Sequence, residues 1–246
     1  MNWLATPFSP FGGSHLAIAS AAAMVCLGCG VAARRQRDRG GRVFADGFAG
    51  VVLGWNLLAN LWWMLPEHWV LDTSLPLHVC DLANLLIPFA IWTRNRLLLA
   101  LVVFWGLGLS TQAFFTPTVN EAPEDFRFWL FWMGHLTIAA GCCVIAGGID
   151  FRPTWKDLRR VLLLGVVVVL VLMGFNAAAG TNYGYVGNDT PSSPTLIDRL
   201  GPWPLRVVWL VLIGSAAQAL VVVLYPLLTG LIGLLAGVRA RRLVRR

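Results

Sequence analysis

The feature that most constrains this chain is a series of seven long apolar runs, separated by short polar connections. The first six runs are close to the roughly 20 residues that an α-helix needs to cross the hydrocarbon core of a bilayer, and the seventh is longer. Because backbone N–H and C=O groups must be paired inside the bilayer, runs of this kind fold as helices. The sequence therefore predicts an all-α, polytopic membrane protein with helices over 14–33, 43–65, 75–92, 97–115, 127–149, 158–180 and 203–236.

These runs leave no room for a soluble domain in a chain of 246 residues, of which 57% are hydrophobic and 13% charged. A soluble enzyme and a nucleic-acid-binding module are excluded, because the net charge of +7 is confined to segments between apolar runs. We expect an external N-terminal segment over 1–13, one transmembrane domain over 14–236 and a basic cytoplasmic tail over 237–246. The last apolar run exceeds one span, so we expect it to tilt, to break around Tyr225–Pro226 or to end in an interfacial segment.

Charge alternates from one predicted connection to the next. The first, third and fifth connections and the tail hold sixteen of the nineteen Lys and Arg residues, whereas the other connections are acidic. The positive-inside rule then predicts that the N-terminus is outside and the C-terminus is cytoplasmic. The basic residues are Arg34, Arg35, Arg37, Arg39, Arg42, Arg94, Arg96, Arg152, Lys156, Arg159, Arg160, Arg239, Arg241, Arg242, Arg245 and Arg246.

Polar side chains gather at one depth, in the outer half of five predicted helices. Such groups are costly inside a bilayer and are therefore candidates for function. If the third helix enters near Leu75, its polar residues lie roughly 5–14 Å below the outer boundary, and His135 lies about 12 Å below it. The set comprises Asn56, Asn60, His78, Cys80, Asp81, Asn84, Gln112, Thr116, His135, Asn176, Asn182 and Tyr183.

Within this set, Cys80 and His135 are the candidate catalytic pair. His78 and Cys80 diverge by about 200° around a helix, so a base for Cys80 has to come from another helix. A cysteine and a histidine are the minimal pair for covalent acyl transfer, in which the imidazole takes the thiol proton and the thiolate attacks an ester. Asp81, Asn84 or Gln112 could orient the imidazole or bind the oxyanion.

Other interpretations of these residues stay open. From spacing alone, a membrane cysteine is more often a small packing residue, and His135 could simply bond a neighbouring helix. Asp81, with His78 as its nearest partner, could exchange protons in a transporter or a sensor. A metal-dependent lipid hydrolase would need His78, Cys80, Asp81 and His135 as ligands, and the spacing of His78 and Cys80 suits a shared metal poorly.

The remaining features are interpreted as structural. Cys26 and Cys29, in a helix rich in glycine and alanine, and Cys142–Cys143 are typical of close packing, and Gly106 and Gly108 favour close helix contact. The stretch over 189–194 is either a lid or a flexible loop.

Several short motifs occur in an order that resembles one integral membrane family, which joins bacterial YwaF-like proteins with the animal transmembrane protein 164. The motifs are Leu-Pro-Leu-His-Val-Cys-Asp-Leu (75–82), Phe-Trp-Gly-Leu-Gly (104–108), Gln112 with Thr116-Pro117, Arg127-Phe128 with Gly134-His135, Arg152-Pro153-Thr154-Trp155, Gly180-Thr181-Asn182-Tyr183 and Gly201-Pro202-Trp203-Pro204. The resemblance covers about residues 40–215.

This resemblance implies a seven-helix protein in the cytoplasmic membrane of a bacterium. The animal branch is described as a phospholipid acyltransferase or transacylase that uses a membrane cysteine and histidine. By motif match, these roles would fall on Cys80 and His135. The resemblance implies membrane phospholipids as partners, and this chemistry requires neither a cofactor nor a metal.

Overall fold

The computed structural model describes residues 8–119, 121–188 and 196–237. All regular structure in these ranges is helical, which confirms the all-α prediction. Six segments are long and apolar enough to cross a membrane, with α4 and η1 counted together, and α3 is a shorter apolar helix. The elements are α1 (Gly13–Asp38), α2 (Val43–Met64), α3 (Val79–Thr93), α4 (Arg96–Gly108), η1 (Ser110–Phe114), α5 (Phe126–Gly148), α6 (Trp155–Ala179), η2 (Tyr183–Tyr185), η3 (Leu196–Leu200) and α7 (Leu205–Leu235).

Polar side chains before several apolar runs set where these helices begin. The side chain of Asn95 accepts hydrogen bonds from the first N–H groups of α4, Asp125 does so for α5, and Thr154 does so for α6. Each cap satisfies donors that the helix itself leaves unpaired. Apolar runs therefore become helices with defined ends.

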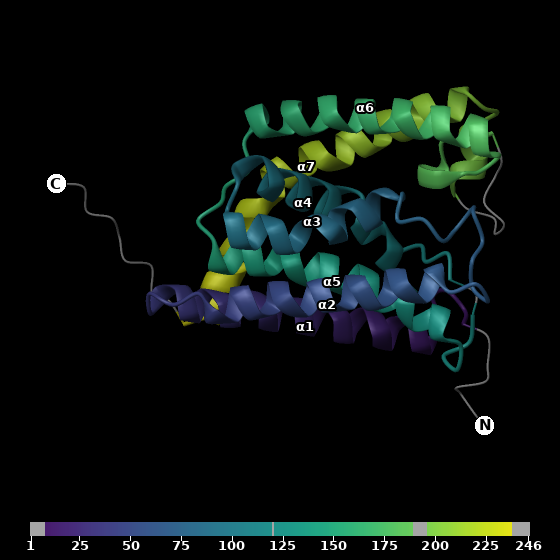
Figure 1. The fold of residues 1–246 in the computed structure, drawn as a ribbon. Helices are drawn as coiled ribbons and strands as arrows, with labels where there is room; N and C mark the ends of the chain where they lie inside the picture. Colours follow the sequence, from purple (N-terminus) through teal and green to yellow (C-terminus); the bar gives the residue numbers. More distant parts are fainter. Residues whose placement is uncertain (1–7, 120, 189–195, 238–246) are drawn as a thin grey trace.

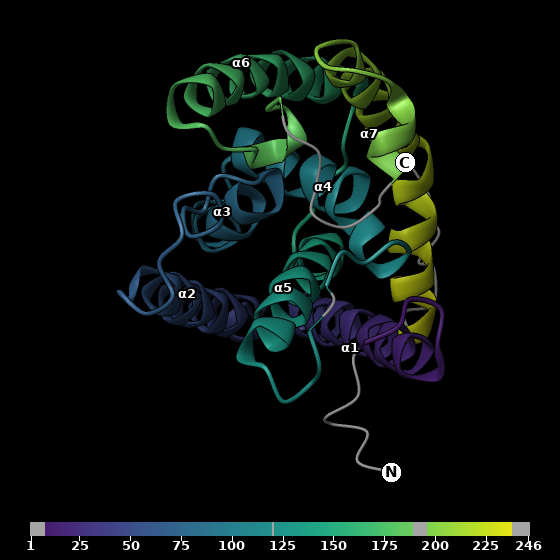
Figure 2. The ribbon, with the colours of Figure 1, turned by 90° about the vertical axis from the view of Figure 1, so that its right-hand side faces the viewer.

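The helices form one bundle in which α5 is central (Figures 1 and 2). α5 packs against α1, α2, α3, α4 and α7, whereas α6 lies at the edge and packs against α4 and α7. Small residues allow the closest approaches. A side chain at Gly147 in α5 would overlap the carbonyl oxygen of Gly30 in α1, and one at Gly108 would meet Gln218 of α7. Close backbone contact thus joins α5 to α1 and α4 to α7.

The cysteines predicted to pack are part of this core. Cys26, Cys142 and Cys143 are buried, and the thiol of Cys142 lies 3.5 Å from the carbonyl oxygen of Val102. Gly106 lies directly against Cys142. Glycine has no side chain, which leaves room for the sulfur of Cys142 at this contact.

The structure corrects one predicted helix end and shows the course of the last apolar run. α1 continues past residue 33 to Asp38, because Arg34 and Asp38 pair across one turn (3.0 Å) beyond the apolar run. The last run forms a single helix, α7, which is continuous through Pro226 and crosses the bundle obliquely (Figure 1). With 31 residues α7 is about 46 Å long, so tilting accommodates its excess length.

The largest correction concerns α3, which begins at Val79 rather than at Leu75. Its 15 residues span about 22 Å, whereas the 23 residues of α5 span about 34 Å. Figure 1 shows α3 stopping short of the end that α2 reaches. The backbone N–H of Leu75 donates to the hydroxyl of Tyr183 (3.0 Å), so this stretch is held by the turn after α6 instead of joining the helix.

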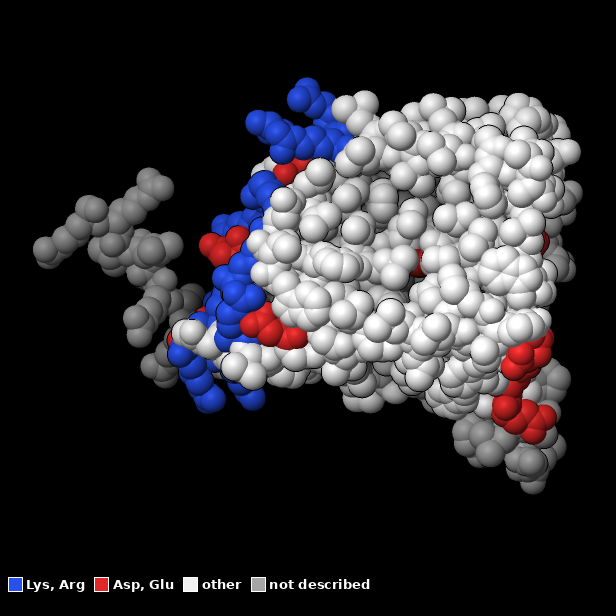
Figure 3. Space-filling model, viewed as in Figure 1, with Lys and Arg blue, Asp and Glu red and all other residues white. Residues whose placement is uncertain are grey.

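Basic and acidic side chains lie at opposite ends of the bundle (Figure 3). The basic end is formed by the connections α1–α2, α3–α4 and α5–α6, and the opposite, acidic end carries Glu67, Asp72, Glu121, Glu124 and Asp125. The lateral face that this view shows between them is almost uncharged, as a bilayer requires. The basic tail over 239–246 and the stretch over 189–194 lie outside the described residues. Which end faces the cytoplasm stays a prediction from the positive-inside rule.

Candidate functional site

Cys80 lies in the first turn of α3, at the point where this short helix begins. The carboxylate of Asp81 accepts a hydrogen bond from the backbone N–H of His78 (3.1 Å), which makes His78 the N-cap. The first bond within the helix runs from Leu82 N–H to the carbonyl of His78. The N–H groups of the first turn are therefore not used by bonds within the helix, and that of Asp81 donates to the side chain of His78. A helix N-terminus of this kind favours an anion.

The Asp81 carboxylate caps the N-terminus of α3 and, among the residues that the structure describes, forms no hydrogen bond with an imidazole ring. One oxygen accepts from the backbone N–H of His78, and the other lies 3.9 Å from the Cys80 sulfur. His78 is indeed the neighbour of Asp81, but the hydrogen bond comes from its backbone and not from its ring. Asp81 therefore caps the helix and lies beside the thiol.

His135 lies in the middle of α5, which packs directly against α3. Its Nδ1 is 2.8 Å from the carbonyl oxygen of Phe131, one turn earlier. A carbonyl only accepts hydrogen bonds, so in the neutral ring Nδ1 carries the proton and Nε2 presents a lone pair. Within the described ranges nothing bonds to Nε2, and the ring is half-buried. His135 is thus arranged as a proton acceptor.

Asn84, one turn after Cys80, sets the level at which α3 meets α5. Its side chain donates to the carbonyl of Gly134 (3.4 Å) and accepts from the hydroxyl of Thr137 (3.0 Å), on either side of His135. Its own carbonyl accepts from the side chain of Asn56 in α2 (3.0 Å). The buried side-chain amides of Asn84 and Asn56 therefore join three helices around the candidate pair.

These contacts bring five of the predicted residues into one group, called here the α3–α5 cluster: His78, Cys80, Asp81, Asn84 and His135. Cys80 and His135 are both half-buried and lie on facing helices. No hydrogen bond joins the thiol to the imidazole, which agrees with the loose geometry that such pairs often have before a substrate binds.

The turn after α6 covers the start of α3. The side chain of buried Asn176 donates to the carbonyl of Tyr183 (2.9 Å) and accepts from the N–H of Tyr183 (2.9 Å) and the hydroxyl of Thr181 (2.8 Å). The hydroxyl of Tyr183 donates to the carbonyl of Leu71 and accepts from the N–H of Leu75. Asn176 and Tyr183 therefore hold two loops together above the cluster.

The ring of His78 lies near two tyrosines of this turn. Its centroid is 5.3 Å from that of Tyr183 and 5.4 Å from that of Tyr185, and the N–H of Gly184 donates to its Nδ1 (3.3 Å). Tyr185 adopts a left-handed backbone conformation (φ 60°), which is uncommon for a residue with a side chain. Burial raises the pKa of its phenol, so the hydroxyl stays protonated at neutral pH.

Tyr185, Gly184 and Thr137 are residues of the site that sequence reasoning missed. Spacing does not distinguish Tyr185 from Tyr183, because both follow α6 in an irregular segment. The usable signal is Gly184 between them, since glycine tolerates the positive φ (67°) of a tight turn. Such a turn can direct two nearby aromatic side chains at one target.

Three predicted site residues lie away from the centre of the cluster. Gln112 and Thr116 are exposed, in and just after η1, where the hydroxyl of Thr116 donates to the carbonyl of Gln112 (3.3 Å). No hydrogen bond or ion pair among the described residues links either side chain to the α3–α5 cluster. Asn182 supports the turn, because its N–H donates to Asp72 (2.8 Å) and its side-chain oxygen accepts from Gly187 (2.9 Å).

Metal ligation is not supported by the positions of these side chains. In the described part of the chain, no three His, Cys, Asp or Glu residues group in a way that could hold a metal ion. The four residues of the hydrolase hypothesis lie in one region but do not converge on a common point.

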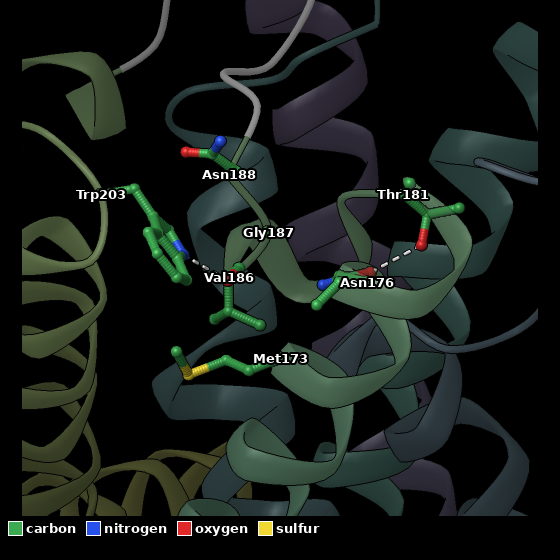
Figure 4. A pocket seen from close by; sticks show the side chains of 9 residues that line it. Met173, Asn176, Thr181, Val186, Gly187, Asn188 and Trp203 are labelled. Atoms are coloured by element: carbon green, nitrogen blue, oxygen red, sulfur yellow. Dashed lines mark hydrogen bonds between the residues drawn. The ribbon is translucent and has the colours of Figure 1, made fainter.

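A cavity of about 380 Å³ lies on the other side of the turn, between the end of α6 and the start of α7 (Figure 4). The hydrogen bond between Asn176 and Thr181 forms part of its wall, and the indole of Trp203 donates to the carbonyl of Val186 (3.1 Å). Met173 contributes apolar surface. Among the predicted site residues, Asn176 lines this cavity, whereas Cys80 and His135 do not.

A second, more open hollow of about 510 Å³ lies where the end of α2 meets the start of α5. Its surface is almost wholly apolar. The lining residues are Leu58, Leu61, Trp62, Leu65 and Phe126.

The model of the TMEM164 family matches this chain over residues 10–225. The chain belongs to the TMEM164 family. The matched range includes Cys80 and His135 and reaches from before α1 into α7, so it is wider than the range of about 40–215 over which motifs resemble the family. No curated protein and no solved structure matches the chain.

Proposed function

We propose that this TMEM164-family protein is a membrane acyltransferase that moves fatty acyl chains between phospholipids. One observation carries the proposal: Cys80 occupies the first turn of a short helix, beside a helix that presents the Nε2 lone pair of His135. A thiol and an imidazole placed in this way can form and resolve an acyl intermediate. The family resemblance assigns the same two residues.

The first half-reaction would transfer the acyl chain to Cys80. The thiol proton moves to Nε2 of His135 while the sulfur forms a bond to the ester carbonyl carbon, whose π electrons move to the oxygen. When this tetrahedral intermediate collapses, the bond between carbon and the glycerol oxygen breaks. The leaving oxygen takes the proton from His135, so the products are a thioester and a lysophospholipid.

The second half-reaction reverses these steps with a different lysophospholipid. Its hydroxyl gives a proton to His135 and attacks the thioester, and the thiolate leaves and regains the proton. The N-terminus of α3 would support both halves, because the N–H groups that the helix leaves unused there favour negative charge nearby.

A lipid substrate suits the surroundings of the site. Cys80 and His135 are half-buried within the bundle, and many large hydrophobic side chains are exposed on its helices. The apolar hollow between α2 and α5 is suited to an acyl chain, since its lining offers almost no polar surface. The substrate would then enter sideways from the leaflet at the acidic end.

The proposal includes a location and an orientation. The family resemblance favours a bacterial cytoplasmic membrane, and the basic end would face the cytoplasm because of its arginines. The α3–α5 cluster would then act in the outer leaflet.

Trapping of the acyl intermediate tests the proposal. Purified protein in detergent micelles is incubated with a phospholipid that carries a radiolabelled acyl chain, and the protein-bound label is measured after denaturation. We expect label that hydroxylamine releases, because it cleaves thioesters. Cys80→Ala and His135→Ala should each abolish labelling, and the double variant should be no worse, because the two groups act as one unit.

Cys29→Ala is the matched control, since Cys29 is the other half-buried cysteine and lies in α1. It should label like the unaltered protein. Label retained in Cys80→Ala, or unchanged turnover in His135→Ala, would refute the mechanism.

A further inference from the structure

The two histidines of the α3–α5 cluster are held in opposite tautomers. At His135 the partner of Nδ1 is a carbonyl, so Nδ1 donates and Nε2 is free to accept a proton. At His78 the partner of Nδ1 is the backbone N–H of Gly184, which can only donate. Nδ1 of His78 is therefore an acceptor, and the proton of the neutral ring is on Nε2.

Protonation of His78 would break this arrangement. An imidazolium carries a proton on both nitrogens, so its Nδ1–H would point at the N–H of Gly184. The rings of Tyr183 and Tyr185 lie close to the imidazole, and the backbone of Gly184 is fixed by its turn. The turn thus fixes Nδ1 of His78 as an acceptor and leaves its Nε2–H to donate, so in this tautomer Nε2 cannot take the thiol proton.

The position of His78 places this donor at the start of α3. His78 is the N-cap residue, two positions before Cys80, at a turn whose N–H groups are not used by bonds within the helix. His135 lies on α5, which packs directly against α3. The donor and the acceptor therefore both lie next to the N-terminal part of α3, which carries the thiol.

We infer that His78 is a catalytic residue that donates a hydrogen bond from Nε2 to the carbonyl oxygen of the acyl group while negative charge develops there. This inference rests on the proposed function. His78 transfers no proton in the step: the thiol proton goes to His135, and the oxyanion is held by the Nε2–H of His78 together with the backbone N–H groups of α3. A neutral imidazole suits this role because it stabilises charge without giving up its proton.

His15 supplies an internal reference for the tautomer. It is buried (3% exposed), its Nδ1 accepts from the N–H of Phe11 (2.9 Å) and its Nε2 lies 2.9 Å from the carbonyl oxygen of Phe114. It therefore has the same tautomer as His78, but it lies in α1, outside the cluster.

The first test reads the tautomers directly, in protein with ¹⁵N-labelled histidine in micelles at neutral pH. The chain has four histidines, so each signal can be assigned by a single His→Gln variant. Nitrogen chemical shifts distinguish a protonated from an unprotonated ring nitrogen. We expect Nε2–H for His78 and His15, and Nδ1–H for His135.

The second test uses the rate of acyl-thioester formation. His78→Leu removes the donor, and it should slow acylation about 10²-fold, the cost of losing one oxyanion donor. His78→Gln places an amide N–H near the position of Nε2 and should recover most of the rate. His15→Gln, the matched control, should acylate at the unaltered rate.

The outcomes separate this inference from the proposed function. Three outcomes would overturn the inference alone. The first is a His78 ring that carries a proton on Nδ1, alone or together with Nε2. The others are equal acylation rates in His78→Leu and the unaltered protein, and no rescue of the rate in a folded His78→Gln variant. Absence of any acyl-thioester in the unaltered protein would overturn the proposed function, and with it the role of His78 in this reaction.

Discussion

Asn84 shows how a single side chain can set the geometry of a membrane site. Its amide reaches Gly134 and Thr137, which flank His135, while its backbone carbonyl receives the amide of Asn56. In a bilayer such bonds contribute on the order of 0.6–2 kcal/mol each, so their greater effect here is to align the helices. The distance between Cys80 and His135 depends on this alignment.

Replacement of Asn84 by leucine should therefore affect the reaction more than the fold. We expect the acylation rate to fall about 10²-fold, because a displacement of about 1 Å at a reacting pair costs this much. The thermal unfolding midpoint in micelles should fall only slightly. Both are measured on the same preparation.

Asn60→Leu is the control for this prediction. The side chain of Asn60 donates to the carbonyl of Asn56 in its own helix and does not join helices. Acylation in this variant should match the unaltered protein. Equal acylation in Asn84→Leu would show that the interhelical bonds do not position the pair.

At the scale of elements, the short length of α3 creates the site. A full-length helix would place its N-terminal N–H groups at the membrane surface, whereas α3 is about 12 Å shorter than α5. The irregular backbone before it is tolerated because the hydroxyl of Tyr183 bonds both Leu71 and Leu75. An open helix N-terminus at membrane depth is a feature that binds anionic groups.

The crossing of α1 and α5 is the tightest contact between helices, and it predicts a large effect of one methyl group. Gly147→Ala should destabilise the bundle by about 1–3 kcal/mol, because the new Cβ would overlap the carbonyl oxygen of Gly30 and neither backbone can yield. The measurement is the thermal unfolding midpoint in micelles.

Gly165→Ala in α6 is the matched control, because a Cβ at this position meets nothing within 4 Å. Its midpoint should be unchanged or slightly higher, since alanine favours helix more than glycine does. Similar midpoints for both variants would contradict the packing seen at the crossing.

On the scale of the whole molecule, charge is separated along the bundle axis, and the lateral face shown in Figure 3 is almost uncharged. The helices alternate in direction, so the basic connections meet at one end although they are far apart in sequence. This arrangement fits one orientation in a membrane.

Reporter fusions test that orientation. A reporter fused after Arg246 or inserted between Gly40 and Gly41 should behave as cytoplasmic, and one inserted within 121–124 should behave as external. If the reporter after Arg246 and the reporter within 121–124 lie on the same side of the membrane, the number of crossings differs from seven by an odd number. If all three are reversed, the basic end faces outward.

The sequence alone determined the helical class, the number of helices and the alternation of charge, because each depends on local composition. An apolar run has no alternative to a helix in a bilayer. Charged side chains such as Arg34 and Arg94 are too costly to place in the hydrocarbon core of the bilayer. The sequence also predicted that Cys80, Asp81, Asn84 and His135 lie at a similar depth in the membrane, since depth follows from counting residues along a helix.

The tertiary structure alone decided what these side chains contact. The start of α3 depends on Tyr183, which lies more than 100 residues along the chain from Leu75. The tautomer of His78 depends on the amide of Gly184, in the same distant turn. Periodicity along one helix carries no information about such partners, because they are brought together by packing between segments that the sequence keeps apart.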